Sequence, residues 1–330
     1  MTQKVSLNDS IQKNTSKHRL EYRQHFRIEK AKSMKIAHIN NISGVASIIA
    51  EQQRKQGYKA DVYVFNNTIY NQFGGIKYYY KSPISRWNLF RKLKEYDIWH
   101  YHYPYGSLKS NLEKRNKNKV YLKHYHGDDL RGKHEDDFCL VSTPDLLQYA
   151  PNGKWLPNAI DIDEAESISS RKNQQKNSSI IRVAHYPHYK KMYNFNDYYT
   201  DALTTLQNEK RCEIIRLLHL SHVQTLETIA VCDIVIGKIL PNIGWFGKFE
   251  LEGMALGKPV IAYVSDELYE KYKPPVCRTT KDTFKEDLES LIEDDIERIR
   301  LAKEGRNYIK EYHSAEGISK SVQECYEKLL

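Results

Sequence analysis

The chain has 330 residues, of which 40% are hydrophobic and 28% charged, a composition typical of a globular protein large enough for two domains. No run approaches the roughly 20 apolar residues of a membrane-spanning helix, and the first thirty residues lack the apolar core of a secretory signal. The five cysteines are scattered and lack metal-ligand spacing, so we expect free thiols and a cytoplasmic protein.

The net charge of +9 is concentrated near the N-terminus. Residues 1–33 hold eight Lys and Arg against three acidic residues, a balance of +5. Such a basic extension suits an anionic partner, either lipid head groups on the inner face of a membrane or nucleic acid. A disordered, solvated extension is the alternative interpretation, and Met34 is an alternative natural start.

The first regular elements predict a parallel α/β domain over residues 34–160. A strand from Met34 leads through a Gly loop into a helix over 45–56, and a second strand follows at 60–65. Strand, helix, strand is a βαβ unit, which builds parallel sheets. Further strands are predicted at 96–102, 120–126 and 138–142, and residues 155–161 mark the exit from this domain.

A polar stretch at 161–179 has no apolar period and is predicted to be an interdomain linker. A second α/β series then runs over 180–310, with strands at 180–185, 213–217, 233–236 and 259–264 and helices at 223–230 and 248–256. The charged, periodic end of the chain should be helical. We expect its final part, 311–330, to return to the first domain.

The richest motif is Ile243-Gly-Trp-Phe-Gly-Lys-Phe-Glu-Leu-Glu-Gly-Met-Ala-Leu-Gly-Lys-Pro-Val-Ile-Ala262. A Gly loop that leads into a helix N-terminus offers free backbone N–H groups and a positive dipole end, which suit a diphosphate. Lys248 would add a charge in the first turn, and Glu252 follows one turn later, where it can accept hydrogen bonds from ribose hydroxyls. A plain loop-helix-strand crossover with a solvated Glu252 is the alternative.

This motif resembles the signature of glycosyltransferase family 4, a retaining group with the two-domain GT-B fold. Glu252 matches the second glutamate of the family signature, which binds the donor ribose. The first glutamate falls at position 244, where this chain has Gly244. The departure concerns the contact with the donor sugar more than the fold.

The resemblance extends over most of residues 34–330 and implies a set of site residues. The histidine that contacts the donor sugar matches His126 in the segment His124-Tyr-His-Gly-Asp-Asp-Leu-Arg131. The basic pair that neutralises the diphosphate matches Lys190 and, by adjacency, Lys191, although the expected spacing reaches Tyr193. The implied catalytic residues are His126, Asp129 and Lys190. The implied donor-binding residues are Gly44, Lys191, Ser221, Gly244, Gly247, Lys248 and Glu252.

Two His-x-His pairs raise a separate question about metal binding. His100 and His102 lie on one face of a predicted strand, and His124 and His126 lie on one face of another. If these strands are neighbours, four imidazoles gather at one end of the sheet and could bind a metal ion. The alternative is that they form hydrogen bonds in a polar cleft. The resemblance implies a metal-independent enzyme without a cofactor, and we expect no metal site.

Taken together, the sequence predicts two Rossmann-like domains facing across a cleft and a retaining hexosyltransferase. The donor would be a UDP- or GDP-sugar, and the acceptor a glycan or a lipid-linked molecule of surface polysaccharide synthesis. Three other functions remain open: a non-catalytic sugar-nucleotide-binding protein, for which Gly244 argues, a nucleotide-sugar epimerase, and a nucleic-acid-binding protein that uses the basic extension. Outside that extension no nucleic-acid motif is present, so we expect no such partner.

Overall fold

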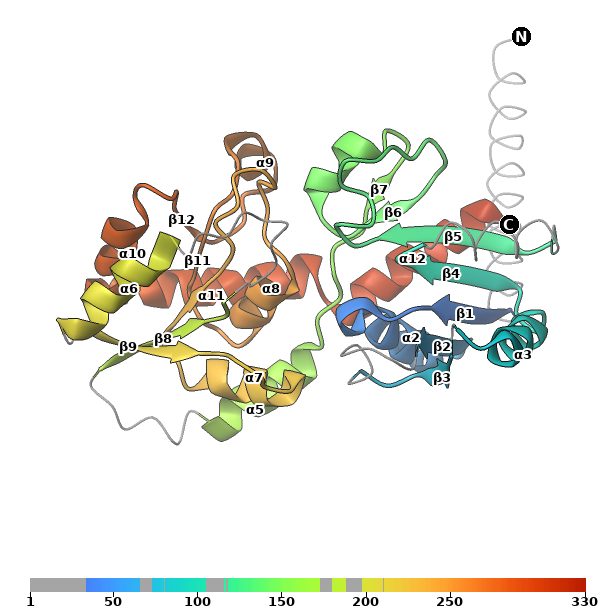
Figure 1. The fold of residues 1–330 in the computed structure, drawn as a ribbon, viewed down its shortest axis with the longest axis horizontal. Helices are drawn as coiled ribbons and strands as arrows, with labels where there is room; N and C mark the ends of the chain where they lie inside the picture. Colours follow the sequence, from blue (N-terminus) through green and yellow to red (C-terminus); the bar gives the residue numbers. More distant parts are fainter. Residues whose placement is uncertain are drawn as a thin grey trace, which may run out of the picture.

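The computed structural model describes residues 34–65, 73–79, 81–104, 116, 118–172, 180–187, 198–209 and 211–330. These residues form two α/β lobes, each built on one sheet, with the chain running from the first lobe to the second and back (Figure 1). The basic extension 1–33 lies outside the described residues. Among the described helices, none is long and apolar enough to cross a membrane.

The N-terminal domain contains a seven-stranded sheet in the order β3-β2-β1-β4-β5-β6-β7. All strand pairs in it are parallel, so the carboxyl ends of its strands meet at one edge. Its strands are β1 (Lys35–Ile39), β2 (Lys59–Phe65), β3 (Ile76–Tyr78), β4 (Ile98–His102), β5 (Val120–Tyr125), β6 (Leu140–Val141) and β7 (Lys154–Trp155). Its helices are η1 (Ile42–Gly44), α2 (Val45–Lys55), α3 (Pro83–Leu93) and η3 (Pro144–Tyr149).

The C-terminal domain contains a five-stranded parallel sheet in the order β12-β11-β10-β8-β9. Its strands are β8 (Ile181–His185), β9 (Cys212–Arg216), β10 (Ile234–Ile236), β11 (Val260–Ala262) and β12 (Cys277–Arg278). Its helices are α5 (Ile162–Lys172), α6 (Tyr198–Asn208), α7 (His222–Ala230), α8 (Lys248–Ala255), α9 (Asp266–Tyr272), α10 (Phe284–Glu293) and α11 (Asp295–Tyr312).

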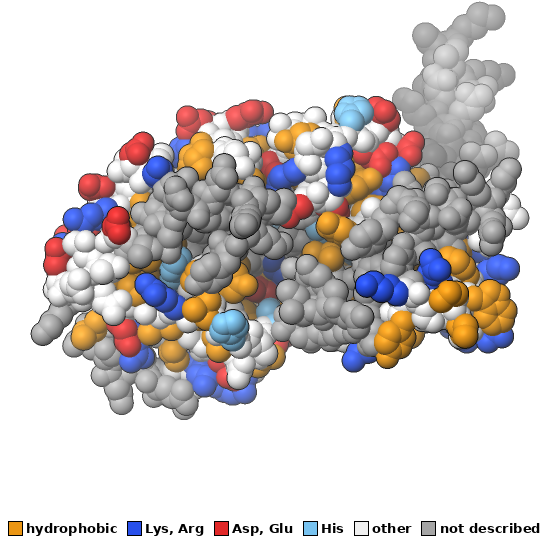
Figure 2. Space-filling view, in the orientation of Figure 1, with side chains coloured by type: hydrophobic (Ala, Val, Ile, Leu, Met, Phe, Trp, Pro, Cys, Tyr) orange, Lys and Arg blue, Asp and Glu red, His pale blue; other side chains and the backbone are white. Residues whose placement is uncertain are grey.

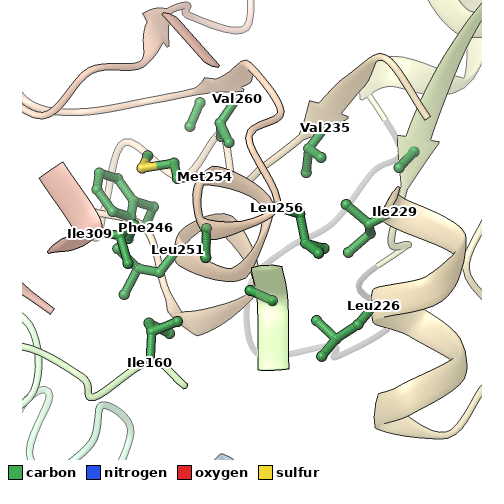
Figure 3. Packing of buried hydrophobic residues seen from close by; sticks show 14 of the residues in the cluster. Ile160, Leu226, Ile229, Val235, Phe246, Leu251, Met254, Leu256, Val260 and Ile309 are labelled. Atoms are coloured by element: carbon green, nitrogen blue, oxygen red, sulfur yellow. The ribbon is translucent and has the colours of Figure 1, made fainter. Parts of the chain in front are cut away.

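Helix α8 is fixed in the core of this domain. Its residues Leu251 and Met254 are buried with Phe246 just before it, Val235 on β10 and Val260 on β11 (Figure 3). Burial of this apolar surface is the main force that holds the helix in place. The N-terminus of α8 is therefore held on a rigid support.

The last helix, α12 (Ala315–Leu329), returns to the N-terminal domain, as the sequence predicts (Figure 1). Ile318, Val322 and Tyr326 are buried against residues of α2 and the first sheet. The helix has an apolar face at the spacing that the 3.6-residue period requires. The two chain crossings between the domains touch one another, because Ile160 N–H donates to the carbonyl of His313 at 2.9 Å.

The linker prediction is wrong for residues 162–172, which form helix α5. Ala165, Ile168 and Ser169 are buried on one face of it, and the two apolar residues join the core that surrounds α8. The side chain of Asp161 accepts from the N–H of Glu164 at 2.9 Å and caps the helix. A short apolar stripe with a capping Asp was the available signal. Residues 173–179 lie outside the described part of the chain.

Candidate functional site

A cavity of about 310 Å³ lies between the two domains. Its N-terminal wall consists of segments that follow the carboxyl ends of β1, β4, β5, β6 and β7, and its C-terminal wall runs from the end of β10 to the start of α8. Ligands of parallel α/β sheets bind at this edge. The lining residues are Ile42, Ser43, Val45, Tyr103, His126, Gly127, Asp128, Arg131, Thr143, Asn158, Lys238, Ile243, Trp245, Phe246, Gly247 and Lys248.

The N-terminus of α8 opens into this cavity. Its N-cap is Gly247, which has no side chain to accept from the N–H groups of the first turn, so they remain available to a ligand. The carboxylate of Glu250 accepts from the backbone N–H groups of Gly247 at 2.9 Å and of Lys238 at 2.7 Å. Glu250 is fully buried and thereby ties the two loops of the C-terminal wall together.

Lys238 is a site residue that the sequence did not predict. It follows β10, lines the cavity, and its Nζ lies 2.5 Å from the point that a Cβ at Gly247 would occupy. The ammonium group therefore stands directly over the N-terminus of α8. Among the described residues, none accepts a hydrogen bond from it. A Gly-Lys pair at the end of a short buried strand was the signal.

Lys248 and Glu252 form an ion pair beside the cavity. Lys248 Nζ lies 3.1 Å from Glu252 Oε1 and donates across the cleft to the carbonyl of Ser43 at 2.6 Å. The same Glu252 oxygen lies 2.7 Å from His222 Nε2. Burial raises the pKa of Glu252, but the Lys248 charge and the His222 hydrogen bond outweigh it, and the net shift is downward.

Glu252 is thus ionised and already has partners. The space next to it is a separate cavity of about 20 Å³, too small for a ribose. A ribose can reach this carboxylate only where Lys248 or His222 moves aside.

Three further predicted donor-binding residues determine the local backbone conformation and do not line the interdomain cavity. Gly44 has φ of +77° and Gly244 has φ of +75°, backbone angles that residues with a Cβ rarely adopt. A Cβ at Gly244 would also lie 3.1 Å from Ser265, so a glutamate does not fit there without rearrangement. The Ser221 hydroxyl caps α7 by accepting from the N–H of Gln224. None of these three residues is among those that line the interdomain cavity.

The loop after β5 carries the predicted pair His126 and Asp129. His126 lines the cavity. Asp129 lies beneath the loop, where its carboxylate accepts from the N–H groups of His126 at 2.9 Å and Gly127 at 2.7 Å. Burial raises the pKa of Asp129 to about 6 against these hydrogen bonds. Asp129 is therefore placed to shape the loop, and Arg131, held by Asp145 at 2.9 Å, is the cation that this loop presents to the cavity.

Lys190 and Lys191, predicted to neutralise the diphosphate, lie outside the described residues. The described cations of the cavity are Arg131, Lys238 and Lys248.

Five histidines gather between β1, β4 and β5. Strands β4 and β5 are neighbours and pair with His102 opposite His124, and β1 adds His38 beside His100. Neighbouring rings lie 4.3 Å to 5.4 Å apart between centroids. Four of the five are fully buried, and His126 is the member that reaches the cavity.

The hydrogen bonds that join His126, His102 and His38 all donate toward Gln53. The amide oxygen of Gln53 accepts from His38 Nε2 at 2.8 Å, so His38 Nδ1 is an acceptor in the neutral ring. His102 Nε2 donates to it at 3.0 Å, and His126 Nε2 donates to His102 Nδ1 at 3.0 Å. His126 Nδ1 then accepts from the Ser142 hydroxyl at 2.7 Å. In this arrangement both ring nitrogens of His126 are used inside the protein.

Two overlapping trios within the cluster have ring nitrogens within 4.8 Å of one another, a spacing compatible with a metal ion. They are His38, His100 and His102, and His102, His124 and His126. Two hydrogen bonds join histidines of these trios, His38 to His102 and His102 to His126, and a metal ion bound through those nitrogens would have to replace them. The expectation of no metal remains a prediction.

Acid should destabilise the protein because the cluster is buried in its neutral form. Burial lowers the pKa of His38 from 6.5 to about 4 and that of His126 to about 3. The unfolded chain therefore binds more protons below pH 6.5, and stability falls with pH in that range. For His38 alone the loss by pH 4 is about 3 kcal/mol. The raised pKa of Asp129 has the opposite effect on stability as the pH falls, but it is one carboxyl group and the cluster has several imidazoles.

Urea unfolding at a series of pH values measures this effect. We expect the free energy of unfolding to be level above pH 6.5 and to fall steeply below it. His134→Asn changes an exposed histidine and should leave the profile unchanged. A profile that stays level down to pH 4 would show that the cluster is hydrated or charged.

Comparisons with known proteins identify the fold. No model of a protein family and no curated protein matches the chain. Solved structures do match. A glycosyltransferase from Rickettsia africae is 12% identical, with a TM-score of 0.60 over 90% of this chain and 98% of that one. Anabaena HepE in complex with UDP is 14% identical, with a TM-score of 0.62 over 89% and 100%. Sucrose-phosphate synthase from Thermosynechococcus elongatus is 14% identical, with a TM-score of 0.59 over 90% and 99%.

The chain has the GT-B fold. Two parallel Rossmann-like sheets, a cavity between them and a last helix that returns to the first domain are all present. At this identity the comparisons establish the architecture, which is the fold that the sequence predicts.

Proposed function

We propose that the protein is a glycosyltransferase that moves a sugar from a UDP- or GDP-sugar to a glycan or lipid-linked acceptor. The observation that carries this proposal is the N-terminus of α8 in the interdomain cavity, with Lys238 and Lys248 beside it. Free N–H groups, a helix dipole and two lysine side chains on one wall of the cavity suit a diphosphate. The UDP complex of the Anabaena neighbour agrees with a nucleotide as ligand.

In this proposal the C-terminal domain binds the nucleotide, and the acceptor enters from the N-terminal side. The bond between the anomeric carbon and the diphosphate oxygen breaks, the oxygen of an acceptor hydroxyl bonds to that carbon, and the hydroxyl proton passes to the departing diphosphate. Lys238, Lys248 and the N–H groups of α8 stabilise the negative charge of the departing diphosphate. We further propose that the acceptor attacks from the leaving-group side, with retention of configuration and without a metal ion.

A panel of UDP-, GDP- and ADP-sugars tests the activity. Release of free nucleoside diphosphate, measured with and without extracts that contain glycan or lipid acceptors, should occur with one donor and increase with acceptor. Binding of a donor without release or transfer in any extract would favour the alternative of a non-catalytic sugar-binding protein. Gly244, which replaces the family's first glutamate, is the observation behind that alternative.

Glu252→Ala should weaken donor binding by about 1.5–3 kcal/mol, the range for hydrogen bonds to a charged group. The reason is that the resemblance places the donor ribose at Glu252, whose ionised carboxylate can accept hydrogen bonds from ribose hydroxyls where Lys248 or His222 moves aside. Calorimetric titration of the donor measures the change. Because Glu252 also holds Lys248, Glu252→Gln separates the two effects: it keeps hydrogen-bonding atoms and removes the charge. Unchanged affinity in both variants would exclude Glu252 from the donor site.

A further inference from the structure

Helix α3 presents large apolar side chains to solvent. Ile84 is 73% exposed and Trp87 is 59% exposed, and with Arg91 they form one stripe at helical spacing. The opposite face of the helix buries Leu89 and Leu93 in the core of the N-terminal domain. The exposed stripe is therefore not needed for the packing of α3.

The surface around this stripe is strongly basic. From Ile76 to Lys94 the sequence has six Lys and Arg residues and no Asp or Glu, although the whole chain carries only +9. These cations are Lys77, Lys81, Arg86, Arg91, Lys92 and Lys94. Figure 2 shows orange and blue side chains side by side over the part of the N-terminal domain where α3 lies, with no red among them on the face shown.

An open hollow of about 450 Å³ lies between β3 and α3. Tyr79 and Ile84 line it together with Lys77 and Lys92. Aromatic and aliphatic walls with the ammonium groups of Lys77 and of Lys92, which also contacts Glu95 at 3.5 Å, match a head group whose phosphate is joined to apolar chains. Arg91 also lies over the Trp87 ring, 5.2 Å from its centroid, which pairs a cation with an interfacial aromatic group.

We propose that this α3 surface docks the protein on an anionic lipid bilayer. Ile84 and Trp87 enter the interface, and the surrounding cations contact acidic head groups, the pattern of an amphipathic helix that lies on a membrane. Nucleic acid is a weaker match, since an exposed isoleucine gains little from a phosphate backbone. The proposal concerns a surface remote from the α8 N-terminus and does not depend on the proposed activity.

Tryptophan fluorescence of the full chain tests this surface directly. Of the four tryptophans, Trp99 and Trp245 are buried and Trp87 is 59% exposed. We expect vesicles of phosphatidylcholine with phosphatidylglycerol to shift the emission to the blue and brominated lipids to quench it. Trp87→Phe should remove most of this response while leaving vesicle binding in place, because phenylalanine also partitions into the interface.

Variants then separate the apolar and the charged contributions in vesicle sedimentation. Ile84→Ser with Trp87→Ser should lower the partition coefficient at least about tenfold, given the apolar area withdrawn. Arg91→Gln with Lys94→Gln should lower it about tenfold or more at low salt, with little effect at high salt. The matched control is Ile296→Ser with Ile299→Ser, since these residues on α11 are 77% and 67% exposed on a helix of mixed charge.

Two results would overturn the proposal. One is equal vesicle binding by the α3 variants and wild type, which would assign membrane binding to residues 1–33. The other is an α3-dependent affinity for DNA or RNA without lipid quenching of Trp87. Far-ultraviolet circular dichroism of each variant confirms that the exposed substitutions leave the fold intact.

Discussion

Lys238→Met is expected to lower turnover roughly a hundredfold to a thousandfold, the effect of removing one preorganised group that stabilises developing charge. The ammonium group stands over the N-terminus of α8, where the proposed diphosphate departs. Its attraction grows as negative charge develops on the leaving group, so turnover should fall more than donor affinity. Steady-state rates and calorimetric donor binding together measure the two effects.

The loop that carries Lys238 should survive this substitution. Glu250 holds it through the backbone N–H of residue 238, which methionine retains. Lys285→Met on α10 removes a cation of the same domain away from the cavity and should leave turnover unchanged. Near-normal turnover in Lys238→Met would place the diphosphate elsewhere, for example on Lys190 and Lys191.

His126→Ala is expected to lower turnover on the order of a hundredfold with little change in nucleotide affinity. His126 is the member of the histidine cluster that reaches the cavity, at the carboxyl end of β5. One ring nitrogen of His126 is hydrogen-bonded to His102 and the other to Ser142, so a sugar hydroxyl has to replace one of these partners. Ser142 also lies 3.1 Å from His124 and keeps a partner after such an exchange.

His126→Phe separates contact from shape. A hydrogen bond to the sugar is lost in both variants, whereas phenylalanine restores most of the ring volume. We expect both variants to be slow. Normal turnover in His126→Ala would remove the residue from the active site, and recovery in His126→Phe would show that it only fills space. Melting curves of both variants identify the third outcome, a histidine required for folding.

The sequence predicts the central strands of both sheets because they are buried apolar runs separated by helical periodicity, but it does not predict β3, β7 and β12, which are two or three residues long and lie at sheet edges. It predicts that each His-x-His pair shares a face of its strand, but that the two pairs meet depends on β4 and β5 being neighbours, which only the structure shows. His38 was missed because strand order is not visible in the sequence: β1 lies between β2 and β4. Helix α5 was missed because its apolar stripe is short and lies within a polar composition.

The candidate site was less predictable than the fold. Lys238 belongs to the site only because the β10 loop folds over the start of α8, a contact fixed by the buried Glu250. Glu250 itself matched no expected spacing. At position 244 the expected glutamate is replaced by glycine, and the left-handed backbone there explains why glycine is suitable. These features depend on loop geometry, which residue types and spacing do not specify.

The most direct test of the proposed nucleotide site is calorimetric titration of the full chain with UDP and GDP and with their monophosphates. We predict that one diphosphate binds at least about tenfold more tightly than its monophosphate, because the terminal phosphate contacts the α8 N-terminus and Lys238, and that Lys238→Met removes most of this difference. Equal binding of diphosphate and monophosphate, or no binding of either nucleotide pair, would contradict the assignment of the interdomain cavity as a nucleotide-sugar site.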